Sequence, residues 1–169
     1  IAGKADSAKF TREEILHPEG WTMLAFISDP RTGLGYQHSF TISNFDLMKR
    51  LPRLLRTQKV DDILKLSDFQ ERIKLYQDEN QKYEQLITKT ARIKGDAIVL
   101  DLRNCQRIPV GNRFLEYVLY PEQNISIRIA DGRNKAFAMI SVGHSIINPT
   151  ATVDVGSLTL KYGGGGHKK

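Results

Sequence analysis

Residues 125–142, ISIRIADGRNKAFAMISV, decide the fold of the second half of the chain. From 125 to 130, isoleucines alternate with Ser126, Arg128 and Ala130, which is the period of two expected of a half-buried strand. Asp131-Gly132 predicts a tight turn, and 136–142 is typical of an apolar returning strand. This stretch is therefore predicted to form an antiparallel β-hairpin.

The segments around this hairpin predict a small α/β domain. Upstream, 97–102 (AIVLDL) is typical of a buried strand, and 111–119 can form a short helix. Downstream, the apolar segment 153–160 can form a strand or a short helix before a glycine-rich turn. The order strand, helix, strand, returning strand, helix and turn favours a mixed sheet with helices, and we place this domain at residues 95–169.

Residues 1–94 are predicted to be mainly helical. Thr11 and Glu14 form a capping-box pattern at the start of a short helix. A second helix, which includes Trp21, is expected to end at Asp29-Pro30. Ser43 is typical of another helix start, and 60–66 predicts a further short helix. The whole chain is thus expected to be α/β, with a helical linker before the small mixed-sheet domain.

The longest helix is predicted from about residue 68 to about residue 93. Its positions 69, 73, 76, 80, 83 and 87 are spaced four and three apart, which gives a heptad-like seam with one polar member, Asn80. We favour packing of this seam within the chain, with pairing to a second copy in a homodimer as the alternative. The charged residues of the other faces are expected to be solvated. They are Glu71, Arg72, Lys74, Asp78, Glu79, Lys82 and Glu84.

The composition is that of an ordinary soluble protein. The 169 residues are 40% hydrophobic and 26% charged, with a formal net charge of +6, which suits a polyanionic ligand such as nucleic acid or phosphate esters. Cys105 is the one cysteine, so no internal disulfide can form, and we expect a reducing, cytoplasmic compartment. No apolar run is long enough to span a membrane, so no membrane partner is expected.

The last stretch, 161–169 (KYGGGGHKK), carries most of the functional information. Successive glycines allow backbone N–H groups to approach an anion closely, and a histidine adds a side chain that can donate a hydrogen bond. A phosphate or a carboxylate is the natural ligand for such a turn. A flexible linker or tail is the alternative, because glycine-rich runs are often linkers. The candidate ligand-binding residues here are Gly163, Gly164, Gly165, Gly166 and His167.

Residues 162–167 (YGGGGH), preceded by VDVGSL at 153–158, resemble the closing motif of the DHH-type phosphoesterases. In that family the motif lies in a C-terminal substrate-binding domain, the DHH-associated domain. The resemblance implies that 163–167 hold a substrate phosphate. The family motif continues into two small residues and a glycine, whereas Lys168 and Lys169 follow His167 here. The most similar subgroup is that of the exopolyphosphatase-related and oligoribonuclease-like proteins.

The resemblance also singles out the end of the returning strand. Many family members have Ser-Leu-Arg-Ser where this chain has SVGHS at 141–145, so Gly143 or His144 takes the place of a phosphate-binding arginine. A glycine N–H and an imidazole can still bind an anion, but without a permanent bidentate charge. Asn112 and Arg113 are candidates for the missing donor. The alternative is that Arg113 is a surface charge.

A metal site is implied in part. Asp6, Ser7 and Phe10 are similar to the fourth metal-binding motif of the family, so the resemblance makes Asp6 a ligand of manganese or magnesium. The alternative is that Asp6 or Ser7 caps a turn. The chain has no Asp-His-His triplet, which supplies further metal ligands in the family. Residues 1–94 are therefore expected to hold the end of a catalytic domain plus a helical linker, and the chain alone is expected to be inactive.

For the complete protein, the resemblance implies a metal-dependent phosphohydrolase or phosphodiesterase. Its substrate would be polyphosphate, another phosphate-containing small molecule or a short oligonucleotide. One alternative is a non-enzymatic nucleic-acid or nucleotide-binding module, which the basic charge balance also fits. Another is a helical dimerisation module built on the seam of residues 68–93.

Overall fold

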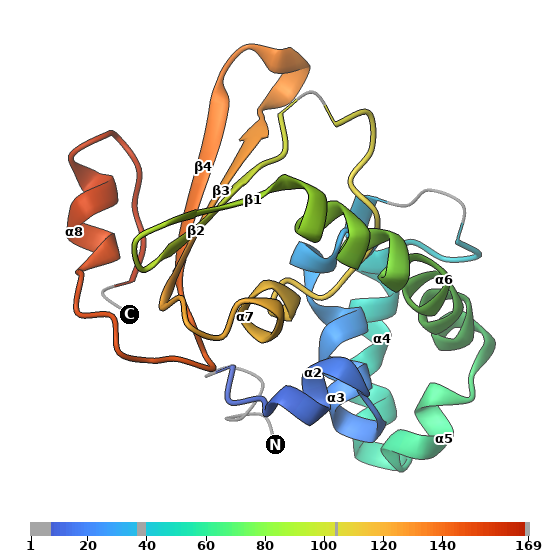
Figure 1. The fold of residues 1–169 in the computed structure, drawn as a ribbon. Coiled ribbons are helices and arrows are strands. Elements are labelled where there is room, and N and C mark those ends of the chain that lie inside the picture. Colours follow the sequence, from blue (N-terminus) through green and yellow to red (C-terminus); the bar gives the residue numbers. More distant parts are fainter. Residues whose placement is uncertain (1–7, 37–39, 104, 168–169) are drawn as a thin grey trace. The chain divides into compact units, whose positions relative to one another are not determined.

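The computed structural model describes residues 8–36, 40–103 and 105–167. Contacts divide the chain into two units. The first comprises Ile1–Leu86 and Arg107–Leu115, and the second comprises Ile87–Gln106 and Glu116–Lys169. The expected boundary between residues 94 and 95 falls inside the second unit. The expected fold class is confirmed, because helices are followed by a small mixed sheet (Figure 1).

The first unit is helical, and its helices begin where the sequence predicts. Thr11 caps the first helix and forms the full capping box with Glu14. Ser43 accepts a hydrogen bond from the backbone N–H of Asp46 at the start of α4. The helices of this unit are α2 (Arg12–Leu16), α3 (Gly20–Ser28), α4 (Asn44–Thr57), α5 (Val60–Leu64) and most of α6 (Ser67–Thr90). Two 3-10 turns, Pro30–Thr32 and Leu34–Tyr36, follow α3.

The apolar seam of α6 packs within the chain, as favoured from its spacing. Its apolar members Phe69, Ile73, Tyr76, Tyr83 and Ile87 are at most 8% exposed. The seam is therefore covered and presents no free apolar stripe to a second copy. Beside it, the rings of Phe10 and Phe26 meet edge to face at 4.8 Å, and Phe114 lies 5.7 Å from Phe10.

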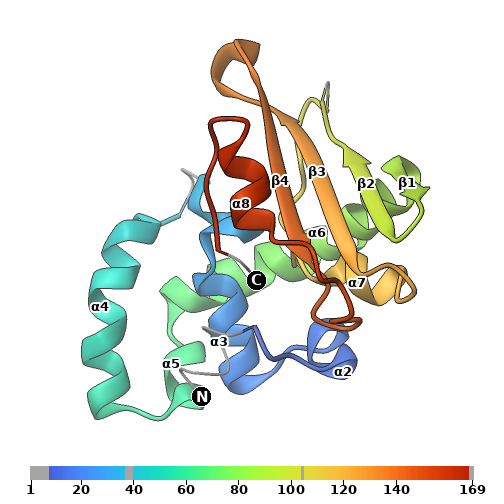
Figure 2. The same ribbon diagram turned by 90° about the vertical axis from the view of Figure 1, so that its left-hand side faces the viewer.

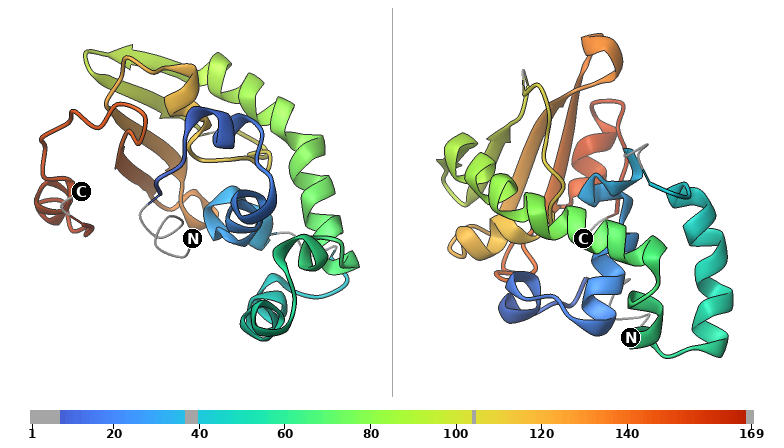
Figure 3. Two further views of the ribbon diagram at one scale, coloured as in Figure 1. Left: turned by 90° about the horizontal axis from the view of Figure 1, so that it is seen from below. Right: turned by 90° about the vertical axis from the view of Figure 1, so that its right-hand side faces the viewer.

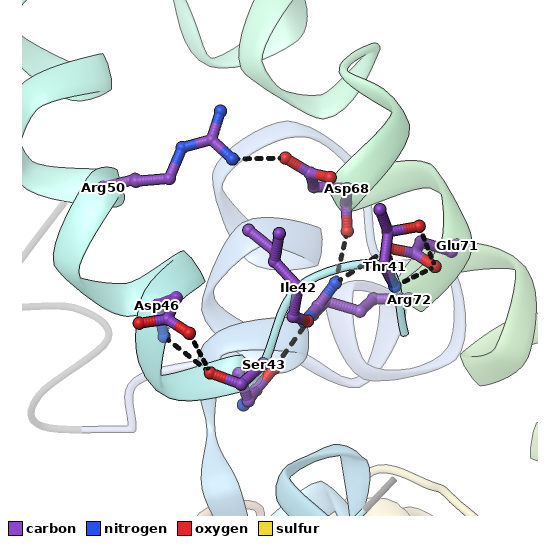
Figure 4. A network of polar contacts seen from close by, with 9 residues as sticks. Thr41, Ile42, Ser43, Asp46, Arg50, Asp68, Glu71 and Arg72 are labelled. Carbon is purple, nitrogen blue, oxygen red and sulfur yellow. Dashed lines mark hydrogen bonds and ion pairs between the residues drawn. The ribbon is translucent and has the colours of Figure 1, made fainter. Parts of the chain in front are cut away.

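Two charged residues of α6 contradict the prediction that they are solvated. The side chain of Arg72 is fully buried. It is the centre of a network of polar contacts (Figure 4). It donates to the carbonyl oxygens of Asp68 (2.6 Å) and Ile42 (2.8 Å) and to Oδ1 of Asn44 (2.9 Å). It also stacks on the ring of Phe40, 4.2 Å from its centroid. Arg72 thus fixes the segment that leads into α4.

Glu79 is the second buried charge, at 4% exposure. Its carboxylate accepts the backbone N–H of Val110 at 2.8 Å and an ion pair from Arg107 at 2.7 Å. Both residues lie on irregular segments whose backbone groups need partners. The helical periodicity of α6 contains no information about segments that pack on it. It therefore predicted that Arg72 and Glu79 lie in solvent.

The second unit contains a four-stranded sheet in the order β1-β2-β3-β4. β2 and β3 are parallel, whereas the β1–β2 and β3–β4 pairs are antiparallel. Its elements are β1 (Ala91–Lys94), β2 (Ala97–Asp101), α7 (Leu115–Leu119), β3 (Ile125–Asp131), β4 (Ala138–His144) and α8 (Val155–Leu160). Within the segment 153–160, residues 155–160 form a short helix. Of the helix expected at 111–119, only the last five residues are helical.

The predicted β3–β4 hairpin is confirmed, with a longer connection than expected. The chain turns through residues 132–137, closed by a hydrogen bond from the Gly132 N–H to the Phe137 carbonyl. Asn134 and Lys135 have φ values of 53° and 57° in this loop. The prediction of a tight turn at Asp131-Gly132 was wrong, because the two left-handed residues lie three positions after this pair.

The predicted end of the long helix was also wrong. The helix ends at Thr90, and residues 91–94 form β1 instead. β1 pairs with β2 from Ala91–Leu100 to Lys94–Ala97, so only Gly95 and Asp96 connect the strands. Gly95 has φ +56°, which suits a two-residue hairpin turn. Residues 91–94 are a strand because they pair with β2. The local sequence pattern contains no information about this pairing.

The two faces of the sheet differ. α7 covers one face of the sheet. Its Tyr117 hydroxyl is hydrogen bonded to Ser126 of β3 (3.0 Å), and its Glu116 forms an ion pair with Arg128 of β3 (2.6 Å). On the other face, Ile140 is 60% exposed. Figure 1 and Figure 2 show α8 on this more open side of the sheet. The glycine-rich segment that follows α8 therefore belongs to the open side.

Candidate functional site

The glycine-rich segment forms a defined turn at the end of α8. Asp154 caps the start of this helix by accepting the Ser157 N–H at 2.9 Å. At its end, the Gly164 N–H donates to the Thr159 carbonyl at 3.0 Å. Gly163 has φ +76°, a conformation that side chains disfavour. The chain then runs back alongside α8 (Figure 1 and Figure 2).

This return depends on a close approach between two glycines. A Cβ atom on Gly156, in the first turn of α8, would lie 2.8 Å from the carbonyl oxygen of Gly166. It would also lie 3.0 Å from the carbonyl oxygen of His167. Both neighbours are backbone atoms, which cannot swing away as a side chain can. The segment 163–167 therefore packs on α8 through a contact that only glycine at 156 permits.

The turn presents unused hydrogen-bond donors to solvent. The N–H groups of Gly163 and Gly164 are engaged by the carbonyl groups of Leu160 and Thr159. Within the described part of the chain, the N–H groups of Gly165, Gly166 and His167 donate to no acceptor. All three residues are exposed. Consecutive free N–H groups of this kind can bind an anionic oxygen.

Gly143 lies in β4, and packing against α7 explains why this position is a glycine. It pairs with Ser126, and a Cβ atom on it would lie 2.8 Å from the Tyr117 hydroxyl. That hydroxyl is hydrogen bonded to Ser126. A residue with a side chain would displace this buried contact. The packing of α7 thus accounts for Gly143, which lies near the place where the similar family has a phosphate-binding arginine.

His144, the last residue of β4, has a buried ring nitrogen without a partner. Among the described residues, nothing bonds to its Nε2 or to Oδ1 of Asn124. The two residues are close along the same sheet edge, because His144 pairs with Ile125. Buried polar atoms of native proteins are usually satisfied by protein, water or ligand. The described residues thus leave these two buried atoms without a hydrogen bond, and no sequence pattern pointed to Asn124.

Arg113 belongs to the first unit, whereas the glycine turn belongs to the second. Its Nε donates to Oδ2 of Asp29 at 3.1 Å, and its guanidinium lies 3.9 Å from the centroid of the Phe114 ring. Arg31 binds the same carboxylate at 2.8 Å. Asp29, expected only to end a helix, therefore also holds Arg113 within the first unit.

The Asp29 carboxylate predicts a pH dependence of stability. Burial raises its pKa, but hydrogen bonds from Arg31 and the charges of Arg31 and Arg113 outweigh burial and hold the pKa below its ordinary value of 3.8. A depressed folded-state pKa contributes stability that is present above the unfolded-state pKa and is lost as pH falls through the folded-state pKa. Asp29→Asn should therefore lower the urea midpoint of unfolding near neutral pH, and the difference from the parent should shrink as pH falls through the folded-state pKa of Asp29.

The measurement is urea unfolding followed by the fluorescence of Trp21, the one tryptophan, which lies in the first unit. Profiles are compared between about pH 7 and about pH 2.5, a range that brackets the carboxylate titration. A constant difference between parent and Asp29→Asn across this range would show that the ion pairs of Asp29 do not contribute to stability.

The metal prediction falls on residues without a structural description. Asp6 and Ser7 lie outside the described residues, whereas Phe10 is a buried core residue. Within 8–36, 40–103 and 105–167, no group of three or more histidine, cysteine, aspartate or glutamate side chains could hold a metal ion. In the same ranges, no helix is long and apolar enough to cross a membrane.

Comparison with known proteins finds a similar solved structure. No protein-family model and no curated protein matches the chain. Among solved structures, the chain is similar to PggH of Vibrio cholerae, described as a pGpG-specific phosphodiesterase. The TM-score is 0.85 and the identity is 41%, over 98% of this chain and 55% of PggH. The chain thus spans about half of that phosphodiesterase, and the match supports the resemblance to phosphoesterases found in the sequence.

Proposed function

We propose that this chain is the linker and substrate-binding part of a DHH-type phosphodiesterase that acts on short linear oligonucleotides such as pGpG. The observation that carries the proposal is the packed glycine turn with its free N–H groups at Gly165, Gly166 and His167. The likeness to PggH supports both the reaction and the class of substrate. Because the chain spans about half of PggH, the catalytic centre is assigned to the remainder of a longer protein.

In this proposal the chain binds and orients the substrate. The three free N–H groups donate to non-bridging oxygens of a terminal phosphate, and the His167 ring adds a further donor. Fixing the phosphate in this way holds the scissile bond in position. Manganese or magnesium would have to be held by residues outside the described part, so we derive no step through a metal. We also propose a cytoplasmic location, because the chain has a single cysteine and no internal disulfide.

A second candidate is a non-enzymatic nucleotide-binding module. It is favoured by the formal net charge of +6, which suits binding of a polyanionic ligand without any chemical step. Polyphosphate, the substrate implied by the exopolyphosphatase-related subgroup, offers phosphate oxygens but no base. The substrate and the reaction can therefore be tested separately.

Direct titration tests the substrate. We expect pGpG to bind the chain at least tenfold more tightly than tripolyphosphate, because the dinucleotide offers base and ribose groups in addition to phosphate oxygens. His167→Ala should weaken pGpG binding roughly tenfold, the loss of one charge-assisted hydrogen bond of about 1.5 kcal/mol. The matched control is His17→Ala, an exposed histidine of the first unit. Equal loss in both variants, or tripolyphosphate binding as well as pGpG, would contradict the proposal.

Turnover separates the two candidate functions. The chain alone, with manganese added, is expected to bind pGpG without hydrolysing it. Adding the remainder of the longer protein should produce hydrolysis. Continued absence of hydrolysis would favour the binding module, and hydrolysis by the chain alone would refute its assignment as the non-catalytic part.

A further inference from the structure

α4 and the residue pair that follows it hold much of the positive charge of the protein. Residues 44–59 contain five basic side chains and one acidic side chain, so this segment carries a formal +4 of the total +6. α4 lies along one outer side of the first unit (Figure 2 and Figure 3). A charge concentrated on one helix attracts polyanions more strongly than the same charge spread over a surface.

The basic residues of α4 fall in a line with one aromatic ring. Phe45, Lys49, Arg53 and Arg56 are separated by four, four and three residues, a spacing that places side chains on one face of a helix. We call these four residues the basic stripe. All four are exposed, Phe45 at 67%. From Phe45 to Arg56 the stripe is about 16 Å long at 1.5 Å per residue.

The charge of the basic stripe is not neutralised by neighbours. Lys49 lies 4.1 Å from the centroid of the Phe45 ring. Across the described ranges, no acidic side chain forms an ion pair with Lys49, Arg53 or Arg56. Arg50, on a different face, contrasts with them, because it pairs with Asp68 of α6 at 2.6 Å (Figure 4).

The opposite face of α4 indicates which polyanion fits. Leu47 is fully buried, and Leu51 and Leu54 are partly buried. The apolar face of the helix is thus turned toward its own unit. A helix that lies on a lipid surface must place that face in the membrane instead. What α4 exposes is a row of cations with one aromatic ring, the combination that single-strand binders use for phosphates and bases.

We propose that the basic stripe binds a single-stranded nucleic acid longer than a dinucleotide. Lys49, Arg53 and Arg56 contact successive phosphates, and a base stacks on the exposed part of Phe45. Stacked nucleotides rise about 3.4 Å each along a strand, so the 16 Å stripe accommodates about five of them. The proposal goes beyond the proposed function, which needs only the glycine turn and a dinucleotide.

The test is fluorescence-anisotropy titration of a labelled single-stranded RNA of ten nucleotides at several salt concentrations. The test variant replaces Lys49, Arg53 and Arg56 together by glutamine. The matched control replaces Lys65, Lys74 and Lys82 by glutamine, which removes the same charge from exposed sites of the same unit. We expect at least a tenfold loss of affinity in the test variant and less than twofold in the control.

Two further measurements sharpen the outcome. The slope of log K against log salt should fall by about 2 in the test variant, at about 0.7 for each lost phosphate contact with a single strand. Phe45→Leu should weaken RNA binding about fivefold with the slope unchanged. Circular dichroism confirms that each variant is folded. The affinity of these variants for pGpG should be unaffected. The experiment can therefore refute RNA binding by the basic stripe without refuting pGpG binding by the glycine turn.

Other results would overturn the proposal. Equal losses in the test and control variants would assign binding to net charge alone. Binding to vesicles with anionic lipid but not to RNA would make α4 a membrane-surface helix. Absence of RNA binding by the parent chain at about 50 mM salt, where electrostatic binding is strong, would also refute it.

Discussion

Gly156→Val is expected to abolish pGpG binding, with at least a thirtyfold loss of affinity. The new side chain would meet the backbone carbonyl groups of Gly166 and His167, because even a Cβ atom would lie within 3.0 Å of both oxygens. The returning chain must then leave α8, and the N–H groups of Gly165 to His167 lose the backbone geometry that this packing holds in place. Preorganised donors lose most of their value when they must be ordered by the ligand itself.

Two variants control for this effect. Ser157→Val places the same side chain at the next position, where the residue is exposed. It removes the hydroxyl bond to Asp154 but keeps the backbone N–H bond to the same carboxylate. Its affinity for pGpG should stay within twofold of the parent. Gly165→Ala places a methyl group where no atom lies within 4 Å, so the turn should persist. Calorimetric titration measures all three, and parent-like affinity in Gly156→Val would show that the packed turn is not the ligand site.

Arg72→Met should destabilise the first unit by about 3 kcal/mol, the range for removing one partner of a buried charge network. The substitution keeps the apolar stem but leaves the carbonyl groups of Ile42 and Asp68 and the Asn44 side chain without their donor. Unpaired buried acceptors carry the full cost of lost hydration. The segment before α4 would lose its attachment to α6.

Trp21 fluorescence during urea unfolding measures this loss within the first unit. Arg50→Met is the matched control, because its ion pair with Asp68 is at the surface, where such pairs contribute at most about 1 kcal/mol. Arg72→Lys keeps the charge but cannot reach three acceptors as a planar fork does, so an intermediate loss is expected. A similar small effect of Arg72→Met and Arg50→Met would refute the role of the buried guanidinium.

The sequence by itself determined the features that depend on near neighbours in the chain. The alternation of isoleucines before Asp131 predicted the β3–β4 hairpin, and the Thr11–Glu14 pair predicted a helix start, because both patterns report local geometry. The glycines of 163–166 also indicated a turn with an accessible backbone. In each case the decisive atoms lie within a few residues of one another.

Tertiary structure decided what depends on distant partners. Arg72 and Glu79 lie on α6 positions that periodicity assigns to solvent, yet irregular segments some 30 residues away bury them by supplying hydrogen-bond partners. Residues 91–94 became a strand because β2 pairs with them. Gly156 became essential to the candidate site because the chain returns to it ten residues later. Such contacts are set by packing in three dimensions, and a local sequence pattern contains no record of them.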